Sequence, residues 1–356
     1  MMAKKILITA GGTGGHVFPA LAVANQLKSE QYRIIWVGAK QGIENQIIPK
    51  AKIPLYQLNI SGLRNKSLLT LIKLPVKLLI ATIQALKILI KQKPDVIVGF
   101  GGYASFVMGL VGAIFGVPLI IHEQNAHPGL TNRILAKFAK SVLVAFPNVL
   151  VSKKTLIVGN PVRTEIADIA TPDNRYDLTQ TKLKVLVLGG SLGARTFNQI
   201  MPQVFAKVNN VAQIIHQVGR GDASSVESAY NAHELNVKVV NFIDDMAQTY
   251  ANTDLIICRS GASTVSEITT CGIAAIFIPY PYAVDDHQRY NAQELVNANA
   301  AFMVIEKDLT IDKLADLINS LSISKCLEMA NIAKQHSHLD TLTQICNIIT
   351  QAINKN

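Results

Sequence analysis

The segment GGTGGH at residues 11–16, called here the first glycine turn, is the stretch best suited to bind an anion. Its glycines let the backbone pack tightly and present N–H groups to a ligand, with the positive end of a following helix behind them. His16 stands at the start of that helix, where an imidazole could take a proton from a bound hydroxyl group. One or two glycines often meet only the geometry of a turn, and a single histidine is often structural. Four glycines beside a histidine favour a ligand site.

The elements around this turn must be a buried strand and a helix. Residues 6–10 form a short apolar run, and residues 17–27 carry apolar side chains at helical spacing, with Pro19 in the first turn. A dinucleotide fingerprint would also require glycine at position 17, where this chain has Val17. The next apolar run, 33–37, continues into Gly38 without the acid that holds a ribose in dinucleotide-binding folds. The pattern therefore argues against NAD binding.

The alternation of strands and helices continues and then starts again. A polar segment at 171–182 separates the two series, and GGSLGAR at 189–195, the second glycine turn, repeats the logic of the first. The fold class is therefore α/β, with two Rossmann-like domains, each a parallel sheet covered by helices, facing across a cleft at the carboxyl ends of the strands. Helices are expected from residue 311 to the end. The other runs that predict parallel strands lie at 94–98, 118–121, 141–145, 155–158, 185–188, 213–217, 237–241, 255–258 and 275–279.

Charge is divided unevenly between the two halves. Residues 1–163 hold 20 Lys and Arg against 4 Asp and Glu, whereas residues 164–356 hold 14 against 20. Much of the positive charge lies in segment 66–93, where lysines interrupt a broad apolar face. Such a stretch is too apolar for a phosphate groove, which argues against nucleic acid, and fits the surface of an anionic membrane. A core helix with solvated lysines is the alternative, and the charge division favours membrane contact.

The composition limits the class of protein and the kinds of site that the chain can contain. Hydrophobic residues make up 49% of the chain and charged residues 16%, as in a folded protein, and no uncharged apolar run reaches the roughly 20 residues of a membrane span. The four cysteines, all beyond residue 257, contain no C-x-x-C pair, so we interpret them as reduced core residues of a cytoplasmic protein. No D-x-D sequence occurs, and we interpret the DDHQ segment at 285–288 as a polar loop. We therefore predict no metal site.

Polar residues follow several predicted strands in the second half, where they could hold a phosphate. Ser191 offers a hydroxyl within the second glycine turn, Arg163 offers a charge, and segment RSGASTVSE at 259–267 leads from a strand into a helix start. Glu267 lies about two turns inside that helix and could accept hydrogen bonds from both hydroxyls of a ribose. A solvated glutamate is the alternative.

Seven motifs in order give the chain a resemblance to the MurG family of peptidoglycan N-acetylglucosaminyltransferases. The resemblance covers nearly the whole chain and is weakest beyond about residue 305. The motifs are GGTGGH at 11–16, GFGGY at 99–103, HEQN at 122–125, GNPVR at 159–163, GGSLGAR at 189–195, FIDDM at 242–246 and RSGASTVSE at 259–267.

This resemblance implies a two-domain GT-B fold and an inverting, metal-independent reaction. N-acetylglucosamine would pass from UDP-N-acetylglucosamine to the C4 hydroxyl of N-acetylmuramic acid in lipid I, the undecaprenyl-diphospho-muramoyl-pentapeptide, to give lipid II. It implies no cofactor, a peripheral place on the cytoplasmic face of the bacterial inner membrane, and other cell-wall synthesis proteins as partners. The expected parts are an acceptor and membrane-associating domain at 1–163, a UDP-sugar domain at 164–340, and a last helix at 341–356 that could pack back on the first domain.

The resemblance also assigns roles to residues. His16 and Glu123 are the candidates for the base, with Tyr103 on the acceptor side. Ile243 would meet the uracil through its backbone, Glu267 the ribose, and Asn125 and Gln288 the sugar, although the alignment leaves open whether Gln288 or Arg289 holds that last position. The donor-site set is Thr13, Gly14, Gly15, Asn125, Arg163, Ser191, Ile243, Glu267 and Gln288.

Two other functions are compatible with parts of the pattern. A UDP-N-acetylglucosamine 2-epimerase would share the fold but needs no lipid, so it leaves segment 66–93 unexplained. A non-catalytic, membrane-bound sensor of nucleotide sugars is the second, and the presence of His16 and Gln288 argues against it.

Overall fold

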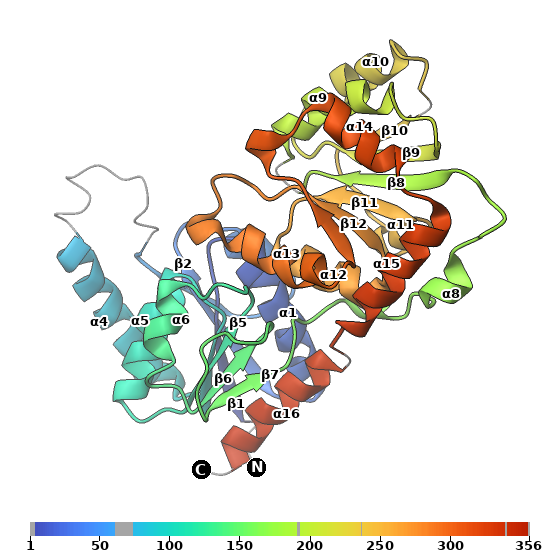
Figure 1. The fold of residues 1–356 in the computed structure, drawn as a ribbon. Coiled ribbons are helices and arrows are strands. Elements are labelled where there is room, and N and C mark those ends of the chain that lie inside the picture. The colour runs from blue at the N-terminus through green and yellow to red at the C-terminus, as the bar shows by residue number, and fades with distance from the viewer. Residues whose placement is uncertain (1–3, 61–73, 191–192, 236, 339, 355–356) are drawn as a thin grey trace. The chain divides into compact units, whose positions relative to one another are not determined.

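The structure, a computed structural model, describes residues 4–60, 74–190, 193–235, 237–338 and 340–354. The chain divides into two compact units. Unit 1 comprises Met1–Val162 and Asp340–Asn356, and unit 2 comprises Arg163–Leu339. Within the described residues, each unit contains one parallel sheet with helices packed on it (Figure 1). The α/β class and the two parallel sheets predicted from the sequence are confirmed.

Unit 1 is built on a sheet whose strands run in the order β3-β2-β1-β4-β5-β6-β7, all parallel within its described residues. The first glycine turn follows β1, an interior strand that pairs with β2 and β4, and leads into α1. The elements are β1 (Lys5–Thr9), α1 (Gly14–Ser29), β2 (Arg33–Ala39), α2 (Glu44–Ile47), β3 (Leu55–Leu58), α4 (Leu74–Gln92), β4 (Val96–Gly99), α5 (Tyr103–Ile114), β5 (Leu119–Glu123), α6 (Leu130–Leu135), β6 (Ser141–Val144), β7 (Thr155–Ile157) and α16 (Thr341–Asn354).

The last helix, α16, packs against α1 as part of unit 1. Its buried residues Ile345 and Ile349 join the core formed by β1 and α1, in which Ile6, Ile8 and Val23 are also fully buried. Strand β1 is apolar on both faces because helices cover both, which is the usual state of a parallel sheet. This core fixes the start of α1 and with it the first glycine turn.

Unit 2 repeats the plan with the strand order β10-β9-β8-β11-β12-β13, again parallel within its described residues. The second glycine turn follows β8. The elements are α7 (Thr164–Ala167), α8 (Pro172–Arg175), β8 (Leu183–Leu188), α9 (Arg195–Phe205), β9 (Val211–Gln217), α10 (Ala223–Asn231), β10 (Val237–Val240), α11 (Met246–Ala251), β11 (Leu255–Cys258), α12 (Ala262–Cys271), β12 (Ala274–Phe277), η1 (Val284–Asp286), α13 (His287–Asn297), β13 (Ala301–Met303), η2 (Glu306–Asp308), α14 (Ile311–Asn319) and α15 (Ile323–Gln335).

The helices of unit 2 lie on two sides of its sheet. Figure 1 shows α9, α10 and α14 on one side and α12 and α13 on the other. Phe197 and Phe205 of α9 pack into the core on the first side with Val185 and Val187 of β8. The strand ends and the loops that follow them form one edge of the sheet, and the predicted nucleotide residues of unit 2 lie along this edge.

The short strands β3 and β13 were not predicted from the sequence, because each has only one buried residue and therefore no clear apolar run. The predicted amphipathic stretch 66–93 is represented by α4, while residues 66–73 lie outside the described part. All four cysteines are buried and free of disulfides.

Candidate active site

The first glycine turn is held from inside unit 1 by a buried glutamate. Glu44, at the start of α2, is fully buried, and its carboxylate accepts hydrogen bonds from the backbone N–H of Gly12 at 3.1 Å and of Ala39 at 2.9 Å. Three glycines make room for it. A Cβ added to Gly11 would lie 2.6 Å from Glu44 Oε1, one at Gly38 would lie 2.7 Å from Glu44 Cγ, and one at Gly42 would clash with the Glu44 carboxylate. The turn is therefore fixed by a residue that the sequence analysis did not single out.

The predicted motif GFGGY packs directly on the first glycine turn. A Cβ added to Gly102 would lie 2.6 Å from the carbonyl oxygen of Gly11, and one at Gly101 would lie 3.1 Å from the ring of His16. Both Gly101 and Gly102 have positive φ, at 95° and 88°, so only glycine fits this approach without strain. The imidazole of His16 thus lies against the GFGGY loop at Gly101. Tyr103, which is 38% exposed, follows this loop as the first residue of α5.

Glu123 ends β5 and has its carboxylate occupied by its own loop. Oε1 accepts from the backbone N–H of Asn125 at 3.0 Å and from its side chain at 3.2 Å. Oε2 accepts from the backbone N–H of Gly129 at 3.1 Å and from Asn132 Nδ2 at 2.9 Å. Glu123 is only 2% exposed. Four donors on a buried carboxylate favour a role in positioning Asn125 over removal of a proton from a substrate.

The neighbours of Glu123 in the HEQN motif are structural. His122 is fully buried with Nε2 2.9 Å from the carbonyl oxygen of Gly159, and burial lowers its pKa to about 4, so it stays neutral at pH 7. Gln124 donates to the carbonyl of Phe100 at 3.0 Å, and Asn160 donates to the carbonyl of Gln124 at 3.0 Å. The motif therefore ties the ends of neighbouring strands together and leaves Asn125 at the partly exposed surface.

In unit 2, the two predicted donor residues Arg163 and Glu267 form an ion pair. Arg163 Nη2 lies 3.5 Å from Glu267 Oε1, and the phenol of Tyr250 donates to Glu267 Oε2 at 2.9 Å. Burial raises the pKa of Glu267, and the charge of Arg163 and the bond from Tyr250 oppose that shift. The Glu267 side chain is still 19% exposed. It is thus a fixed carboxylate with an open side, as ribose binding would require.

The FIDDM motif begins α11 beside this carboxylate. Asp245 caps α11 by accepting from the backbone N–H of Gln248 at 2.8 Å. Asn241, just before the motif, donates to the carbonyl of Gly219 at 3.0 Å and so ties the motif to the turn after β9. Ile243, the predicted uracil contact, is 9% exposed. Its side chain is packed inside, which suits a residue expected to act through its backbone.

Gln288 lies in the first turn of α13, and its side-chain oxygen accepts from the backbone N–H of Tyr280 at 2.9 Å. Arg289 points a different way, with Nη1 3.9 Å from Asp286. Gln288 is therefore hydrogen-bonded to the loop after β12, whereas the side chain of Arg289 is exposed. This contact favours Gln288 over Arg289 as the residue oriented by that loop.

Ser191 lies outside the described residues, so its predicted phosphate contact belongs to the proposals below. The described ends of the second glycine turn are tight: a Cβ added to Gly189 would lie 2.7 Å from the backbone nitrogen of Ala194. Gly193 has φ of 77° and packs on the backbone of Val218, where a Cβ would clash. The turn therefore repeats the close backbone approach of the first one.

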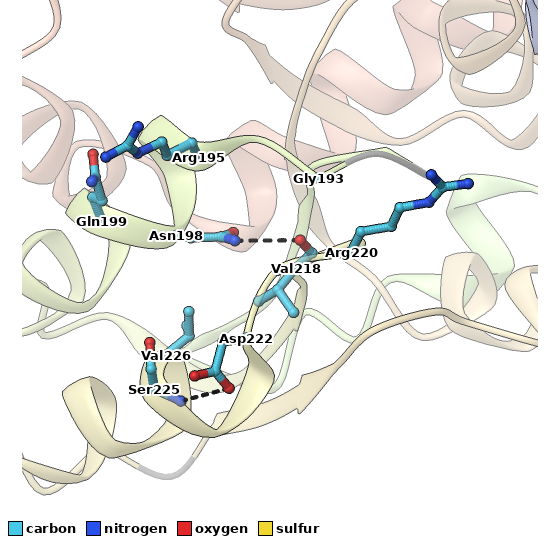
Figure 2. A pocket seen from close by; sticks show the side chains of 10 residues that line it. Gly193, Arg195, Asn198, Gln199, Val218, Arg220, Asp222, Ser225 and Val226 are labelled. Carbon is cyan, nitrogen blue, oxygen red and sulfur yellow. Dashed lines mark hydrogen bonds between the residues drawn. The ribbon is translucent and has the colours of Figure 1, made fainter.

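A cavity of about 350 Å³ lies beside this turn, between α9 and the turn that joins β9 to α10 (Figure 2). Its arginines do not converge, because Figure 2 shows the guanidinium groups of Arg195 and Arg220 pointing away from each other. Asp222 is engaged in capping α10, and Asn198 donates to the carbonyl of Val218 at 3.3 Å. The cavity is on the α9 side of the sheet, whereas Glu267 is on α12. The lining is Gly193, Arg195, Asn198, Gln199, Val218, Arg220, Gly221, Asp222, Ser225 and Val226.

Within the described residues, no group of three or more His, Cys, Asp or Glu side chains is arranged to hold a metal ion. Along the same part of the chain, no helix combines the length and apolar character needed to cross a membrane.

Comparison with known families accounts for both units. Residues 6–144 match the model of the glycosyltransferase family 28 N-terminal domain, and residues 184–345 match that of the family 28 C-terminal domain. The chain belongs to glycosyltransferase family 28. The matched regions include both glycine turns and the Glu267 carboxylate.

One relative of this family 28 chain is named for a specific sugar transfer. It is 43% identical over 98% of its length to the UDP-N-acetylglucosamine–N-acetylmuramyl-(pentapeptide) pyrophosphoryl-undecaprenol N-acetylglucosamine transferase of Paraburkholderia phymatum, of which 94% is covered. The crystal structure of Acinetobacter baumannii MurG is similar with a TM-score of 0.88 and 36% identity, covering 98% of this chain and 99% of that one. The resemblance to MurG inferred from the sequence motifs is confirmed.

The fold is shared more widely than the sequence. UDP-GlcNAc 2-epimerase from Neisseria meningitidis matches with a TM-score of 0.65 over 99% of this family 28 chain and 100% of that one, at 15% identity. That likeness concerns the fold alone.

Two residues of this family 28 glycosyltransferase were missed by the sequence analysis. Glu44 had a detectable signal: it is one of only four acids in residues 1–163, and Gly38 and Gly42 stand shortly before it in the sequence. A scarce acid in a basic half is a candidate for a buried structural contact. Tyr250 had no detectable signal in the sequence, because its hydrogen bond to Glu267 joins two helices that are separated by a strand.

Proposed function

We propose that this chain transfers N-acetylglucosamine from UDP-N-acetylglucosamine to the C4 hydroxyl of undecaprenyl-diphospho-N-acetylmuramoyl-pentapeptide, giving the disaccharide lipid of peptidoglycan synthesis. The observation that carries the proposal is the 43% identity over 98% of the chain to a relative named for this transfer. The 0.88 TM-score to MurG supports it.

Unit 2 is proposed to hold the nucleotide of the donor. Glu267 accepts from the ribose, the backbone at Ile243 meets the uracil, and Arg163 contributes positive charge. Ser191 and the N-terminus of α12, which begins after Gly261, neutralise the diphosphate through a hydroxyl and helix N–H groups. The ion pair between Arg163 and Glu267 supports this arrangement, because it opposes the rise in the pKa of Glu267 that burial causes and so favours the charged carboxylate.

Unit 1 is proposed to hold the acceptor. The first glycine turn of the same unit is assigned by the family resemblance to the donor, with contacts from Thr13, Gly14 and Gly15 at the start of α1. Tyr103 lies at the start of α5 and is proposed to contact the acceptor. The remaining sugar contacts of the donor are assigned, by the family resemblance, to Asn125 and Gln288.

The reaction is proposed to invert the anomeric configuration without a metal. A base removes the proton from the C4 hydroxyl as its oxygen forms a bond to the anomeric carbon, and the bond from that carbon to the UDP oxygen breaks on the opposite face. The negative charge that develops on UDP is stabilised by Ser191 and the start of α12.

We assign the base to His16 and give Glu123 a positioning role. His16 lies at the start of α1, where the positive end of the helix favours the neutral imidazole that a base requires. Glu123 already accepts four hydrogen bonds. Taking a proton would cost it contacts that hold its loop.

Unit 1 is also proposed to bind the cytoplasmic face of the bacterial inner membrane as a peripheral protein. Helix α4 has no acidic residue, lies against α5 (Figure 1), and carries Lys77, Lys87 and Lys91 beside exposed apolar side chains. Such a surface fits an anionic bilayer, where the acceptor lipid resides. The exposed apolar residues are Val76, Leu79, Ile80, Ile83 and Ile90 of α4 and Ile114 and Phe115 of the α5 end.

The test is transfer of labelled N-acetylglucosamine from UDP-N-acetylglucosamine to a short-chain analogue of the lipid acceptor, with inversion read from the linkage of the product. Metal independence is checked by adding a chelator. Conversion of UDP-N-acetylglucosamine alone to its manno epimer, without transfer, would instead assign the chain to the epimerase reaction.

A further inference from the structure

Tyr250, in α11, is a buried residue whose phenol contacts the proposed nucleotide site. Its side chain is fully buried, and the hydroxyl donates to Glu267 Oε2 at 2.9 Å. Burial and the nearby carboxylate raise the pKa of Tyr250 well above its usual value, so the hydroxyl keeps its proton and acts as a donor. A buried donor with one carboxylate acceptor fixes the rotation of that carboxylate.

The Glu267 carboxylate has capacity left after this contact. An ionised carboxylate offers about four acceptor positions, and Tyr250 uses one of them on Oε2. Arg163 lies on the other side, with Nη2 3.5 Å from Oε1. Because the two contacts come from different elements, the plane of the carboxylate is set by both. The remaining positions are those that a pair of ribose hydroxyls would take.

A single arginine holds the two helices of this contact together. Arg175 Nη1 donates to the carbonyl of Tyr250 at 3.0 Å, and Arg175 Nη2 donates to the carbonyls of Cys271 at 3.3 Å and Gly272 at 2.5 Å. The guanidinium thus joins α11 to the end of α12, the helix that carries Glu267. The distance between the phenol and the carboxylate is therefore determined by the backbone and not only by the two side chains.

We propose that Tyr250 is the positioning residue that sets recognition of the donor ribose. Its hydroxyl holds the Glu267 carboxylate in the orientation that accepts from the ribose. Without that bond, the carboxylate turns toward Arg163, and the preference for a nucleotide with a 2′-hydroxyl is reduced. This inference rests on the proposed role of unit 2 as the UDP site.

The test is calorimetric binding of UDP and of 2′-deoxy-UDP to the full chain, which needs no acceptor lipid. In wild type, UDP should bind about tenfold more tightly than 2′-deoxy-UDP, the effect of one hydrogen bond to a charged group. In Tyr250→Phe, the affinity for UDP should fall and the ratio of the two affinities should approach one. In the transfer assay, the same variant should raise KM for the donor and change kcat little.

Tyr230→Phe is the matched control. Tyr230 is also a fully buried tyrosine of unit 2, and its hydroxyl lies 2.9 Å from His216 Nδ1 on the other side of the sheet. Its removal costs a buried hydrogen bond of similar kind but should leave the ratio of UDP to 2′-deoxy-UDP affinity unchanged.

The outcomes separate this inference from the proposed function. A Tyr250→Phe variant that keeps the wild-type ratio overturns the positioning role, and so does a Tyr230→Phe variant that loses the ratio equally, because the effect would then be general loosening. A wild type that does not distinguish the two nucleotides, or binds neither, overturns it as well. Absence of sugar transfer with intact discrimination refutes the proposed reaction and leaves the role of Tyr250 supported.

Discussion

The backbone N–H of Gly12, in the first glycine turn, donates to the carboxylate of Glu44, the first residue of α2, at 3.1 Å. The other oxygen of the same carboxylate accepts from Ala39 at the end of β2. One buried acid therefore couples the first glycine turn to the neighbouring strand end. In the basic half of the chain, Asp95 is used in a similar way, accepting from the backbone N–H of Lys5 at 2.7 Å.

Glu44→Gln should destabilise the protein by about 1.5–3 kcal/mol, because an amide NH2 group replaces one carboxylate oxygen and cannot accept from a backbone N–H. The first glycine turn should shift with it, so the transfer rate should fall by about tenfold. Thermal unfolding and steady-state transfer measure the two effects. Glu30→Gln, at an exposed acid of the same unit, is the control and should leave both values unchanged. If Glu44→Gln behaves like this control, Glu44 does not hold the turn.

The strands could be predicted from the sequence because the parallel sheets consist of short apolar runs, and the glycine turns could be predicted from their local glycine content. The contacts that fix the site could not be predicted from the sequence. The bond from Tyr250 to Glu267 and the four donors on Glu123 depend on which loops meet after folding, and no spacing in the chain encodes that. Glu123 is the clearest example, since the family resemblance made it a candidate for the base, whereas its contacts favour a positioning role.

His16→Gln should lower kcat by roughly 10²–10⁴-fold and leave UDP affinity nearly unchanged, because the amide can hydrogen bond but cannot take the proton. The limb of the pH–rate profile that reports the base should also disappear. Rapid-mixing or steady-state kinetics on the soluble acceptor analogue, together with UDP calorimetry, provide these values.

Glu123→Gln distinguishes the two candidates for the base. If Glu123 positions Asn125, the variant should lose stability and raise KM for the donor while keeping the shape of the pH–rate profile. Retention of most of the wild-type rate by His16→Gln, with loss of the basic limb in Glu123→Gln, would transfer the assignment from His16 to Glu123.

Replacing Lys77, Lys87 and Lys91 with Glu should release the protein from anionic vesicles, since each lysine near such a surface contributes about 1 kcal/mol. Co-sedimentation with phosphatidylglycerol vesicles should show at least a tenfold loss of bound protein, and added salt should weaken wild-type binding. Transfer to a water-soluble acceptor should be unchanged. The control replaces Lys182, Lys238 and Lys313 of unit 2, which are exposed, with Glu. Equal loss of binding in that variant would show a general charge effect and contradict a role for α4.

The buried pair of His216 and Tyr230 should make the stability of unit 2 depend on pH. Burial lowers the pKa of His216 from its ordinary 6.5 to about 4, so the unfolded chain binds a proton at a higher pH than the folded chain does. Its contribution to stability is therefore complete above pH 6.5 and is lost as the pH falls toward 4, to a total of roughly 3 kcal/mol. Thermal unfolding of wild type should show a lower midpoint at pH 5 than at pH 7.5.

The variant His216→Gln isolates this effect. At pH 7.5 it should be less stable than wild type, because Gln does not reproduce the packing of the ring against Tyr230, whose centroid lies 5.8 Å away at an angle of 81°. Its midpoint should nevertheless fall less between pH 7.5 and pH 5, since the proton-binding difference at this position is gone. His233→Gln, at an exposed histidine that follows α10, should show the same fall in unfolding midpoint between pH 7.5 and pH 5 as wild type. If the unfolding midpoint of His216→Gln falls as much between pH 7.5 and pH 5 as that of wild type, other groups cause the acid sensitivity.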